Sequence, residues 1–266
     1  MDLAGVKVDV LLFTYRRAPV DSLLAIQAMV AYSRKQGLDV EQGFYGNALV
    51  HTSRNKAFAA AREDARFILW VDDDMVPQPD ALVRLVEHDK PIVSALFTNR
   101  VEPIQYTLQE YSPSRDEFAK IETVATDKLI KGPIGVGLAF VLTRRDALDT
   151  IREYHLSGAD WMDENKAMLD RLHVRNEKRE EERKRIATAR HRLWEERKGI
   201  RIFDYQVLWN EWQLGEDLGF FRRLLRCGLE THVDTSVWVG HMGDYCFGPW
   251  DMGDKHHDAI ADRAAG

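Results

Sequence analysis

The chain has 266 residues, of which 45% are hydrophobic and 30% are charged. These values are typical of a globular protein with a buried core, and they exclude a chain that is disordered throughout. No stretch approaches the roughly 18 uninterrupted apolar residues of a membrane-spanning helix, and the first residues show no secretion signal. The two cysteines, Cys227 and Cys246, argue against a disulfide scaffold or a structural zinc site, so we expect a cytoplasmic protein.

The charge is unevenly distributed. The whole chain has a net charge of -6, but residues 171–201 contain twelve Lys and Arg against six Glu, a net charge of +6. The rest of the chain therefore carries -12. An acidic protein does not bind nucleic acid through its overall charge, so the basic segment needs its own explanation.

The first hundred residues alternate between predicted strands and helices. We expect strands at 6–13, 38–44, 66–71 and 91–96, and helices at 19–36, at 56–62 with Ser53 as the N-cap, and at 79–86. This alternation predicts a parallel sheet flanked by helices, the α/β class.

The second half is more mixed. Short strands are expected at 104–108, 138–142, 231–233 and 236–239, and helices at 145–154 and 215–227. Residues 165–199 have high helix propensity, with no apolar side chain between Arg175 and Arg185, so they predict a charged helical insert outside the core. Residues after His241 are expected to have little regular structure. No internal repeat or linker appears, and we expect one two-lobed domain.

Four short motifs contain candidate functional side chains. Carboxylates after a buried strand, as in Asp72-Asp73-Asp74, lie where open α/β sheets bind ligands, and their oxygens suit Mg²⁺ or Mn²⁺. The other three motifs are Thr52-Ser53-Arg54-Asn55 before an Ala-rich helix, Gly215-Glu216-Asp217 at a helix start, and Gly240-His241-Met242-Gly243 after a strand. Each motif taken alone also fits a solvated turn, a capped helix or a hydrogen-bonded loop histidine.

The order of these motifs along the chain resembles that of nucleotide-sugar glycosyltransferases with the GT-A fold. The resemblance extends from about Val8 to His241 and is most specific over 53–79 and 215–228. It implies a Rossmann-like, mostly parallel sheet flanked by helices. It also implies a nucleotide-sugar-binding lobe at 1–100, an acceptor-binding lobe at 101–241 with the charged insert at 165–199, and a C-terminal tail at 242–266.

The resemblance assigns roles to individual residues. Asp72, Asp74 and His241 match metal ligands for Mn²⁺ or Mg²⁺, and Asp217, with Glu216 beside it, matches the catalytic base. The nucleotide-sugar contacts implied are Thr14, Tyr15, Arg16, Arg54, Asn55, Asp72 and Asp73. Gly135 and Gly137 resemble the segment that lets the acceptor approach the backbone. The Gln-x-x-Arg-Trp motif of processive polysaccharide synthases is missing, so we do not expect a polymer synthase.

The expected reaction is sugar transfer from a UDP- or GDP-sugar to an acceptor hydroxyl, assisted by a divalent ion. The basic segment 171–201, with Arg183, Lys184 and Arg185 at its centre, fits either a solvated helix or an arm that binds an anionic acceptor or a partner subunit. DNA with a hydroxymethylated base is one such acceptor.

Other interpretations remain open at this point. Within glycosyl transfer, a small molecule, a glycan or a lipid-linked sugar competes with DNA as the acceptor. A nucleotidyltransferase would normally carry a glycine-rich loop after the first strand, whereas residues 14–19 contain no glycine. A non-catalytic sugar- or nucleic-acid-binding module would be expected to lose Asp74, Asp217 or His241, and all three are present.

Overall fold

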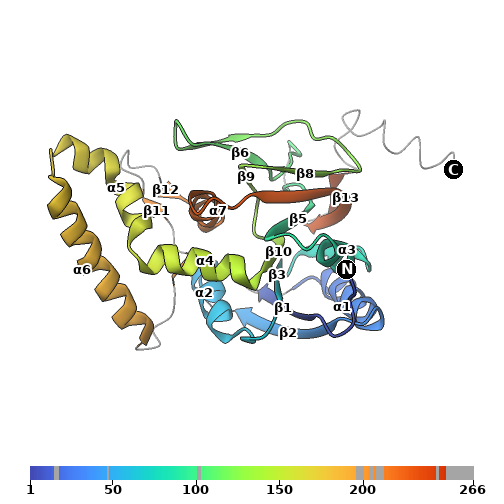
Figure 1. The fold of residues 1–266 in the computed structure, drawn as a ribbon. Coiled ribbons are helices and arrows are strands. Elements are labelled where there is room, and N and C mark those ends of the chain that lie inside the picture. The colour runs from blue at the N-terminus through green and yellow to red at the C-terminus, as the bar shows by residue number, and fades with distance from the viewer. Residues whose placement is uncertain are drawn as a thin grey trace.

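The computed structural model describes residues 1–14, 18–46, 48–100, 103–195, 201–203, 206–207, 213–243 and 246–249. Within these ranges no helix is long and apolar enough to cross a membrane. Helices cover both faces of a central sheet, and a pair of helices projects from one side of the molecule (Figure 1).

The first half of the chain alternates strands and helices as expected. Its elements are β1 (Lys7–Thr14), α1 (Val20–Lys35), β2 (Asp39–Gly46), α2 (Val50–Ala60), β3 (Phe67–Asp72), β4 (Met75–Pro77), α3 (Ala81–Glu87) and β5 (Ile92–Leu96).

The second half adds short strands and four helices among the described residues. Its strands are β6 (Gln109–Ser112), β7 (Glu117–Lys120), β8 (Leu129–Gly132), β9 (Ile134–Gly135), β10 (Phe140–Arg144), β11 (Gln206–Val207), β12 (Gln213–Leu214), β13 (Thr231–Met242) and β14 (Cys246–Phe247). Its helices are α4 (Arg145–Leu156), α5 (Ala159–Arg171), α6 (Asn176–Glu195) and α7 (Glu216–Arg226).

The central sheet has the strand order β14-β13-β5-β10-β3-β1-β2, with β4 and β8 paired to β13. β1 is parallel to β2 and β3, and β5 is parallel to β13, whereas β10 runs antiparallel to its neighbours β3 and β5. The register places Phe13 opposite Asp72 and Thr14 opposite Gly46. The carboxyl ends of β1, β2 and β3 therefore meet at one edge of the sheet, and the predicted fold class is confirmed.

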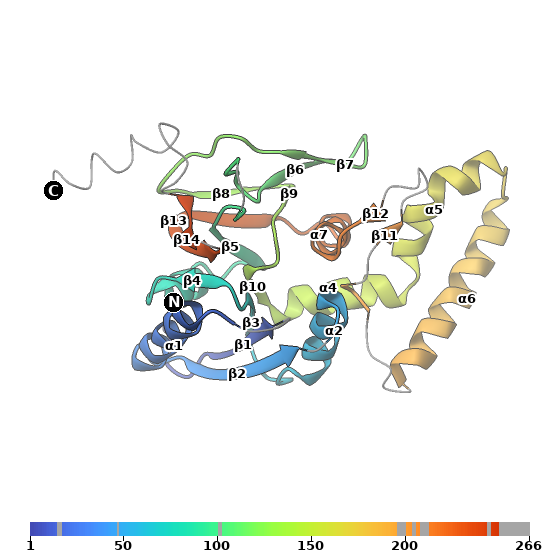
Figure 2. The ribbon, with the colours of Figure 1, turned by 180° about the vertical axis from the view of Figure 1, so that it is seen from behind.

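Successive side chains of β3 point to opposite faces of the sheet, and each face has its own apolar core. Leu69 belongs to a cluster with residues of α1 and α3, whereas Trp70 belongs to a cluster with residues of α2, α4 and α7. Figure 2 shows from behind that α1 lies on one side of the strands and α2, α4 and α7 lie on the other. Strands from both halves of the chain form one sheet, and the division into lobes at residue 100 stays a prediction.

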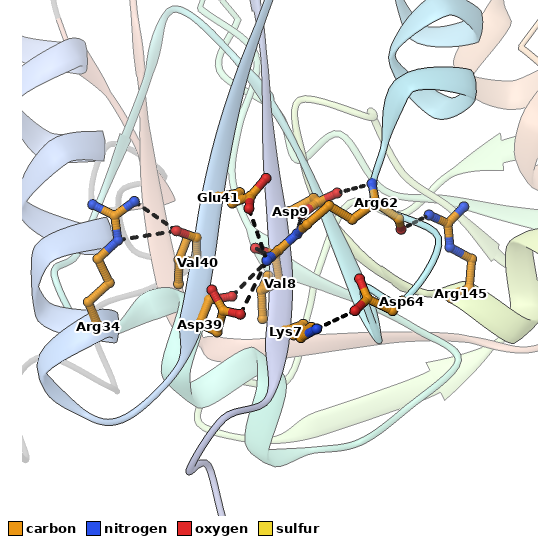
Figure 3. A network of polar contacts seen from close by, with 10 residues as sticks. All are labelled: Lys7, Val8, Asp9, Arg34, Asp39, Val40, Glu41, Arg62, Asp64 and Arg145. Atoms are coloured by element: carbon orange, nitrogen blue, oxygen red, sulfur yellow. Dashed lines mark hydrogen bonds and ion pairs between the residues drawn. The ribbon is translucent and has the colours of Figure 1, made fainter.

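A polar network fixes the end of α2 to β1 and β2 (Figure 3). Arg62 donates from Nε to the buried carboxylate of Asp9 at 2.6 Å, and from its backbone N–H to the same carboxylate at 2.7 Å. Its guanidinium also donates to the backbone oxygens of Val8 and Asp39, each at 3.1 Å. Arg62 directly follows α2, and Arg54 lies within it. The network therefore helps to hold in place the helix that carries the Arg54 side chain.

Several predicted boundaries were wrong. The helix expected at 56–62 begins at Val50, and Ser53 is not its N-cap, because the Ser53 N–H donates to Leu49 O within the first turn. The strand expected at 104–108 is reduced to a single bridge between Thr98 and Tyr106. The two strands expected at 231–239 form the single strand β13, with an irregularity in register between Asp234 and Trp238.

The charged insert is helical, as expected, but it is a hairpin of two helices. The chain turns between α5 and α6, where His173 adopts a positive φ of 49°. α6 returns along α5, and its backbone at Arg183 passes so close to Gly158 that a Cβ there would lie 3.1 Å from Arg183 O. Most of the tail at 242–266 lies outside the described residues, although Cys246 and Phe247 pair with β13.

A buried carboxylate attaches this hairpin to the rest of the molecule. Asp160 is fully buried and forms ion pairs with Arg190 of α6 and with Arg223 of α7, and it bonds to His155 Nδ1 at 2.7 Å. Burial alone would raise the pKa of Asp160, but His155, Arg190 and Arg223 lower it well below its ordinary value. The carboxylate is therefore ionised and holds three elements together.

Substitution of this carboxylate should destabilise the protein. Asp160→Ala removes the buried counter-charge of Arg223, which is buried, and of Arg190, which is half-buried, so we expect the free energy of unfolding to fall by about 3–5 kcal/mol. Denaturant titration measures the loss. Asp170→Ala removes the exposed pair with Arg179 in the same hairpin and should cost about 0–1 kcal/mol. Equal losses in the two variants would contradict the anchoring role.

Candidate active site

The candidate site lies at the sheet edge where β1 and β3 end. Thr14 is the last residue of β1, and Asp72 is the last residue of β3. Asp73 and Asp74 form the turn between β3 and β4. Because β4 pairs with β13, His241 lies opposite Met75, and the Met242 N–H donates to Asp74 O at 2.7 Å. This pairing brings a histidine near the C-terminus next to the aspartate turn.

Arg54 is the centre of the site. Its side chain is almost fully buried and contacts three carboxylates: Asp217 at 2.8 Å, Glu216 at 3.1 Å and Asp72 at 3.1 Å. Its guanidinium also lies 5.6 Å from the centre of the Phe13 ring. The carboxylates come from the end of β3 and the first turn of α7, so Arg54 joins the two halves of the site. The sequence associated Arg54 with the nucleotide, whereas its observed contacts are with these acids.

The two acids on either side of Arg54 have raised pKa values. Burial raises the pKa of Asp72 to about 6, against the opposing charge of Arg54 and with a further increase from Asp217. Burial also raises the pKa of Asp217, Arg54 opposes the increase, and Glu216 adds to it. A carboxylate with a raised pKa accepts a proton more readily, which suits a general base.

Asp74 and His241 form a second group in the same site. His241 Nε2 lies 3.4 Å from Asp74 Oδ2, and Arg100 pairs with the same oxygen. His241 Nδ1 lies 2.9 Å from Thr98 O, and because a carbonyl can only accept, Nδ1 is the donor. The lone pair of a neutral His241 is therefore on Nε2, beside Asp74. Asp74 Oδ1 is buried and has no hydrogen-bond partner among the described residues.

This second group fits a divalent cation. A carboxylate oxygen that is buried without a partner, next to an imidazole nitrogen oriented by a backbone carbonyl, is an arrangement typical of metal ligands. The expected three-ligand set is not assembled, however. Among the described residues no group of three His, Cys, Asp or Glu could hold a metal, and the Asp72 side chain contacts Arg54 instead.

Arg54, Arg100 and the acids around them line one cavity of about 490 Å³, whereas His241 is not part of its lining. Five carboxylates and two guanidinium groups line it, together with Thr14, apolar side chains and Tyr45. The acids are Asp72, Asp73, Asp74, Glu216 and Asp217, and the cations are Arg54 and Arg100. Burial raises the pKa of Asp73, whereas a hydrogen bond from Thr14 lowers it. The cavity is large enough for a ligand of drug size.

Three expected nucleotide contacts lie elsewhere or cannot be placed. Tyr15 and Arg16 lie outside the described residues. Asn55 does not line the cavity, and its Oδ1 accepts a hydrogen bond from the Phe203 N–H at 3.2 Å. Asn55 therefore supports the chain segment that packs beneath α7.

Arg100 and Tyr45 line the cavity but were not predicted from the sequence. Tyr45 stacks on Phe13, with ring centres 6.0 Å apart. Tyr45 is near the end of β2, and Arg100 follows β5. A search for polar and aromatic residues at the carboxyl end of every predicted strand would have included both.

The two glycines of the expected acceptor segment have different surroundings. Gly137 lines a separate cavity of about 270 Å³, which Asp217 also lines. At Gly135, a Cβ would lie 2.7 Å from the Phe118 ring and 3.2 Å from a Leu218 methyl group. Gly135 therefore makes room for packing within the protein, and an acceptor contact there stays a prediction.

The basic residues Arg183, Lys184 and Arg185 lie on α6, away from the cavity lining. Arg183 lies 3.5 Å from Glu180, and Arg185 lies 3.7 Å from Glu182. Part of their charge is therefore balanced within the helix.

Residues 47–152 match the family described as Glycosyl transferase family 2. The matched segment runs from just before α2 into α4 and includes Arg54 and Asp72–Asp74. No curated protein matches the sequence. This segment of the chain is therefore similar to the family 2 glycosyltransferases over the residues that form the core of the candidate site.

The fold overlaps in part with solved structures. The catalytic domain of Drosophila β1,4-galactosyltransferase 7 in complex with xylobiose is 14% identical, with a TM-score of 0.43, over 87% of this chain and 68% of that one. A mutant of the same enzyme in complex with manganese, UDP-Gal and xylobiose is 14% identical, with a TM-score of 0.44, over 96% and 74%. The 4-diphosphocytidyl-2C-methyl-D-erythritol synthase of Anaerococcus prevotii is 7% identical, with a TM-score of 0.36, over 56% and 76%. Overlaps of this extent say nothing about this chain's own substrate.

The charge of Arg54 should be visible in the pH dependence of turnover. Because Arg54 lowers the pKa of Asp217, Arg54→Gln should raise it further, so that Asp217 is protonated at higher pH. We expect the acid limb of the kcat/KM profile to move up by roughly one to three pH units. Thermal unfolding of the variant tests whether it is folded. An acid limb that stays in place in a folded Arg54→Gln variant would contradict this coupling.

Proposed function

We propose that the protein transfers a hexosyl group from a UDP- or GDP-sugar to an acceptor hydroxyl, with Mn²⁺ or Mg²⁺ as the cofactor. The observation that carries the proposal is that a single cavity contains Asp217 in the first turn of α7 and Asp74 beside His241. Asp217 also lines the neighbouring cavity, so a base and two adjoining binding spaces meet at one carboxylate.

The charge of the larger cavity supports the need for a cation. Five carboxylates face two guanidinium groups, so acidic side chains remain in excess even when Asp72 or Asp217 is protonated. A diphosphate brought into such a cavity would be repelled by like charges. Asp74 and His241 would hold the divalent cation. When bound, the cation neutralises negative charge on the diphosphate leaving group.

The side chains then divide the remaining work. Asp217 accepts the proton of the acceptor hydroxyl as its oxygen forms a bond to the anomeric carbon. The bond from that carbon to the diphosphate breaks, and its electron pair leaves with the nucleoside diphosphate. Arg54 holds Asp217 and Asp72 in place, and Arg100 is a cation within reach of the diphosphate. Thr14 and Asp73 are proposed contacts for the nucleoside. A cytoplasmic location, supported by the low cysteine count, is part of the same proposal.

Substitutions should separate donor binding from catalysis. Asp74→Ala should abolish both nucleotide-sugar binding and turnover, because the diphosphate loses its counter-ion. Asp217→Asn should spare nucleotide binding and lower turnover by about 10²–10⁴-fold, the usual contribution of a general base. Titration calorimetry and nucleotide release with Mn²⁺ measure the two quantities. Glu216→Gln is the matched control, since Glu216 contacts the same arginine. Equal loss of nucleotide affinity in the Asp74 and Asp217 variants would make Asp217 a binding residue.

A hydroxymethylated DNA base is a second candidate acceptor. The observation in its favour is an open groove on α6 lined by Lys184, His191 and Arg192 together with Ala187 and Thr188, with no acid in its lining. The same charged helix could instead contact a second subunit, and an oligomer is the alternative explanation of its charge.

Salt dependence distinguishes these explanations. A DNA-binding arm gives a log–log slope of roughly -0.9 per phosphate that it neutralises. Replacement of Arg183, Lys184 and Arg185 by Glu should weaken binding to duplex DNA by decades at low salt and flatten that slope, and it should leave nucleotide-sugar affinity unchanged. Lys35→Glu, at the end of α1, is a control for a change in overall charge. If the parent protein does not bind DNA at about 50 mM salt, α6 is a solvated helix or a contact between subunits, and the DNA proposal is wrong.

A further inference from the structure

The β6–β7 hairpin, residues 109–120, lies along one side of α7 (Figure 2). Its tip carries Asp116, which adopts a positive φ of 55°. The Asp116 carboxylate accepts two hydrogen bonds from the guanidinium of Arg222, one from Nε at 2.8 Å and one from Nη2 at 2.6 Å. Arg222 is almost fully buried in α7. A bidentate contact of this kind fixes both the distance and the orientation of the two elements that it joins.

Two further side chains contact the same carboxylate. Arg226, four residues after Arg222, lies 3.4 Å from Asp116, and the Tyr111 hydroxyl donates a hydrogen bond to it. Burial alone would raise the pKa of Asp116, but its two arginine neighbours and the Tyr111 hydroxyl lower that pKa to about 2. The carboxylate is therefore ionised at neutral pH and balances the buried charge of Arg222.

The contact between the β6–β7 hairpin and α7 extends toward the candidate active site. Leu218, Arg222 and Arg226 follow one another at four-residue spacing, so they lie along one face of the helix. At Gly135, which pairs with β6, a Cβ would lie 2.7 Å from the Phe118 ring and 3.2 Å from a Leu218 methyl group. The β6–β7 hairpin therefore follows this face of α7 as far as Leu218, the residue directly after the proposed base.

The open end of the β6–β7 hairpin lines the cavity of about 270 Å³ beside Asp217. Gln109 and Lys120 are cross-strand partners at this end, and both line the cavity together with Leu218. The larger cavity of about 490 Å³ has no residue of 109–120 in its lining. Because the tip and the open end belong to one short two-stranded unit, release of the tip from α7 would move one wall of the smaller cavity.

Asp217 is held independently of the β6–β7 hairpin. Its carboxylate pairs with Arg54 of α2 at 2.8 Å. Asp72 at the end of β3 contacts the same guanidinium at 3.1 Å. A displaced hairpin would therefore leave the proposed base and the larger cavity in place and change only the space beside them.

We propose that Asp116 is a positioning residue, which through Arg222 holds one wall of the cavity beside Asp217, and that the acceptor enters this cavity. The proposal rests on the proposed glycosyl transfer, because it takes Asp217 as the base. Loss of the Asp116–Arg222 contact should impair transfer to an acceptor. It should spare both binding of the nucleotide-sugar and its hydrolysis by water, since neither needs the wall.

Asp116→Asn tests the proposal. Asparagine tolerates a positive φ and has nearly the same size, so this variant removes the charge and keeps the turn. The acceptor probes are the methyl glycosides of glucose, galactose and mannose and a hydroxymethylated DNA duplex, with nucleotide release from UDP- and GDP-sugars as the readout. We expect kcat/KM for an active acceptor probe to fall by about tenfold to a hundredfold. The dissociation constant of the nucleotide-sugar and the rate of its hydrolysis should stay within about twofold.

The matched control is Glu117→Gln. Glu117 follows Asp116 directly, but its carboxylate is exposed and lies 4.0 Å from the exposed Arg115. This variant removes one negative charge from the same hairpin tip without touching the contact with α7. It should leave transfer, hydrolysis and binding of the nucleotide-sugar at the parental values.

A double variant separates positioning from folding, because Asp116→Asn leaves the buried guanidinium of Arg222 without its carboxylate. Arg222→Gln removes that charge, and thermal unfolding shows which variants are folded. If Asp116 acts through Arg222, the two changes are not additive, and the double variant should be impaired in transfer about as much as either single variant. A folded double variant with the parental kcat/KM would overturn the proposal.

Fluorine NMR of protein labelled with fluorotyrosine follows the cavity wall without any substrate. Tyr111 contacts Asp116, whereas Tyr106 lines the cavity beside Asp217, and Tyr→Phe variants assign the two signals. Asp116→Asn should shift both signals, and Glu117→Gln should shift neither. A shift confined to Tyr111 would mean that the tip does not control the wall, and the proposal would be wrong.

The outcomes separate this proposal from the proposed function. If transfer, hydrolysis and nucleotide-sugar binding fall together in a folded Asp116→Asn variant, Asp116 is a structural residue only, and glycosyl transfer stands. If no UDP- or GDP-sugar releases nucleotide under any condition, the proposed function fails. The fluorine signal of Tyr106 then still decides whether Asp116 holds the cavity wall, and it decides the same when none of the acceptor probes accelerates nucleotide release.

Discussion

The site depends on one buried cation. Arg54 has almost no exposed surface and is compensated by Asp72, Glu216 and Asp217, which no single element could supply. An uncompensated charge at this depth would cost several kcal/mol, so α2, the end of β3 and the start of α7 must come together in one arrangement. The same ion pairs hold a proton acceptor at the junction of two cavities. The side chains that stabilise the buried charge thus also hold the proposed base.

Local patterns were sufficient to predict most of the fold. The apolar run that ends at Val71 and the Gly215–Gly228 helix are strong local signals, and both elements lie within one or two residues of the expected bounds. Errors arose where tertiary contacts override local preference. Ser53 resembles an N-cap, yet α2 starts a turn earlier and Ser53 is buried in it. The turn between α5 and α6 contains no glycine or proline that would mark it in the sequence. His173 adopts the positive φ there instead.

The candidate site could be predicted as a set of residues but not as a set of contacts. Asp74 and His241 were expected together, and the pairing of β4 with β13 brings them together. The sequence contains no signal for what Arg54 contacts, since its partners are fixed only when α7 packs on the sheet. Asp72 was expected to bind the metal, but its carboxylate pairs with the guanidinium of Arg54 instead. Arg100 was missed because it follows a strand without any recognisable motif.

The long-range character of the Arg54 ion pairs bears on how the chain folds. Arg54 and Asp217 are 163 positions apart in sequence, whereas Arg54 and Asp72 are 18 apart. Contacts between distant segments close large loops and form late in folding. The N-terminal strands and α2 can therefore form while Arg54 has a single carboxylate partner, and docking of α7 completes the set. Any partly folded state in which α7 is not docked therefore lacks two of the three carboxylates around Arg54, and the proposed base with them.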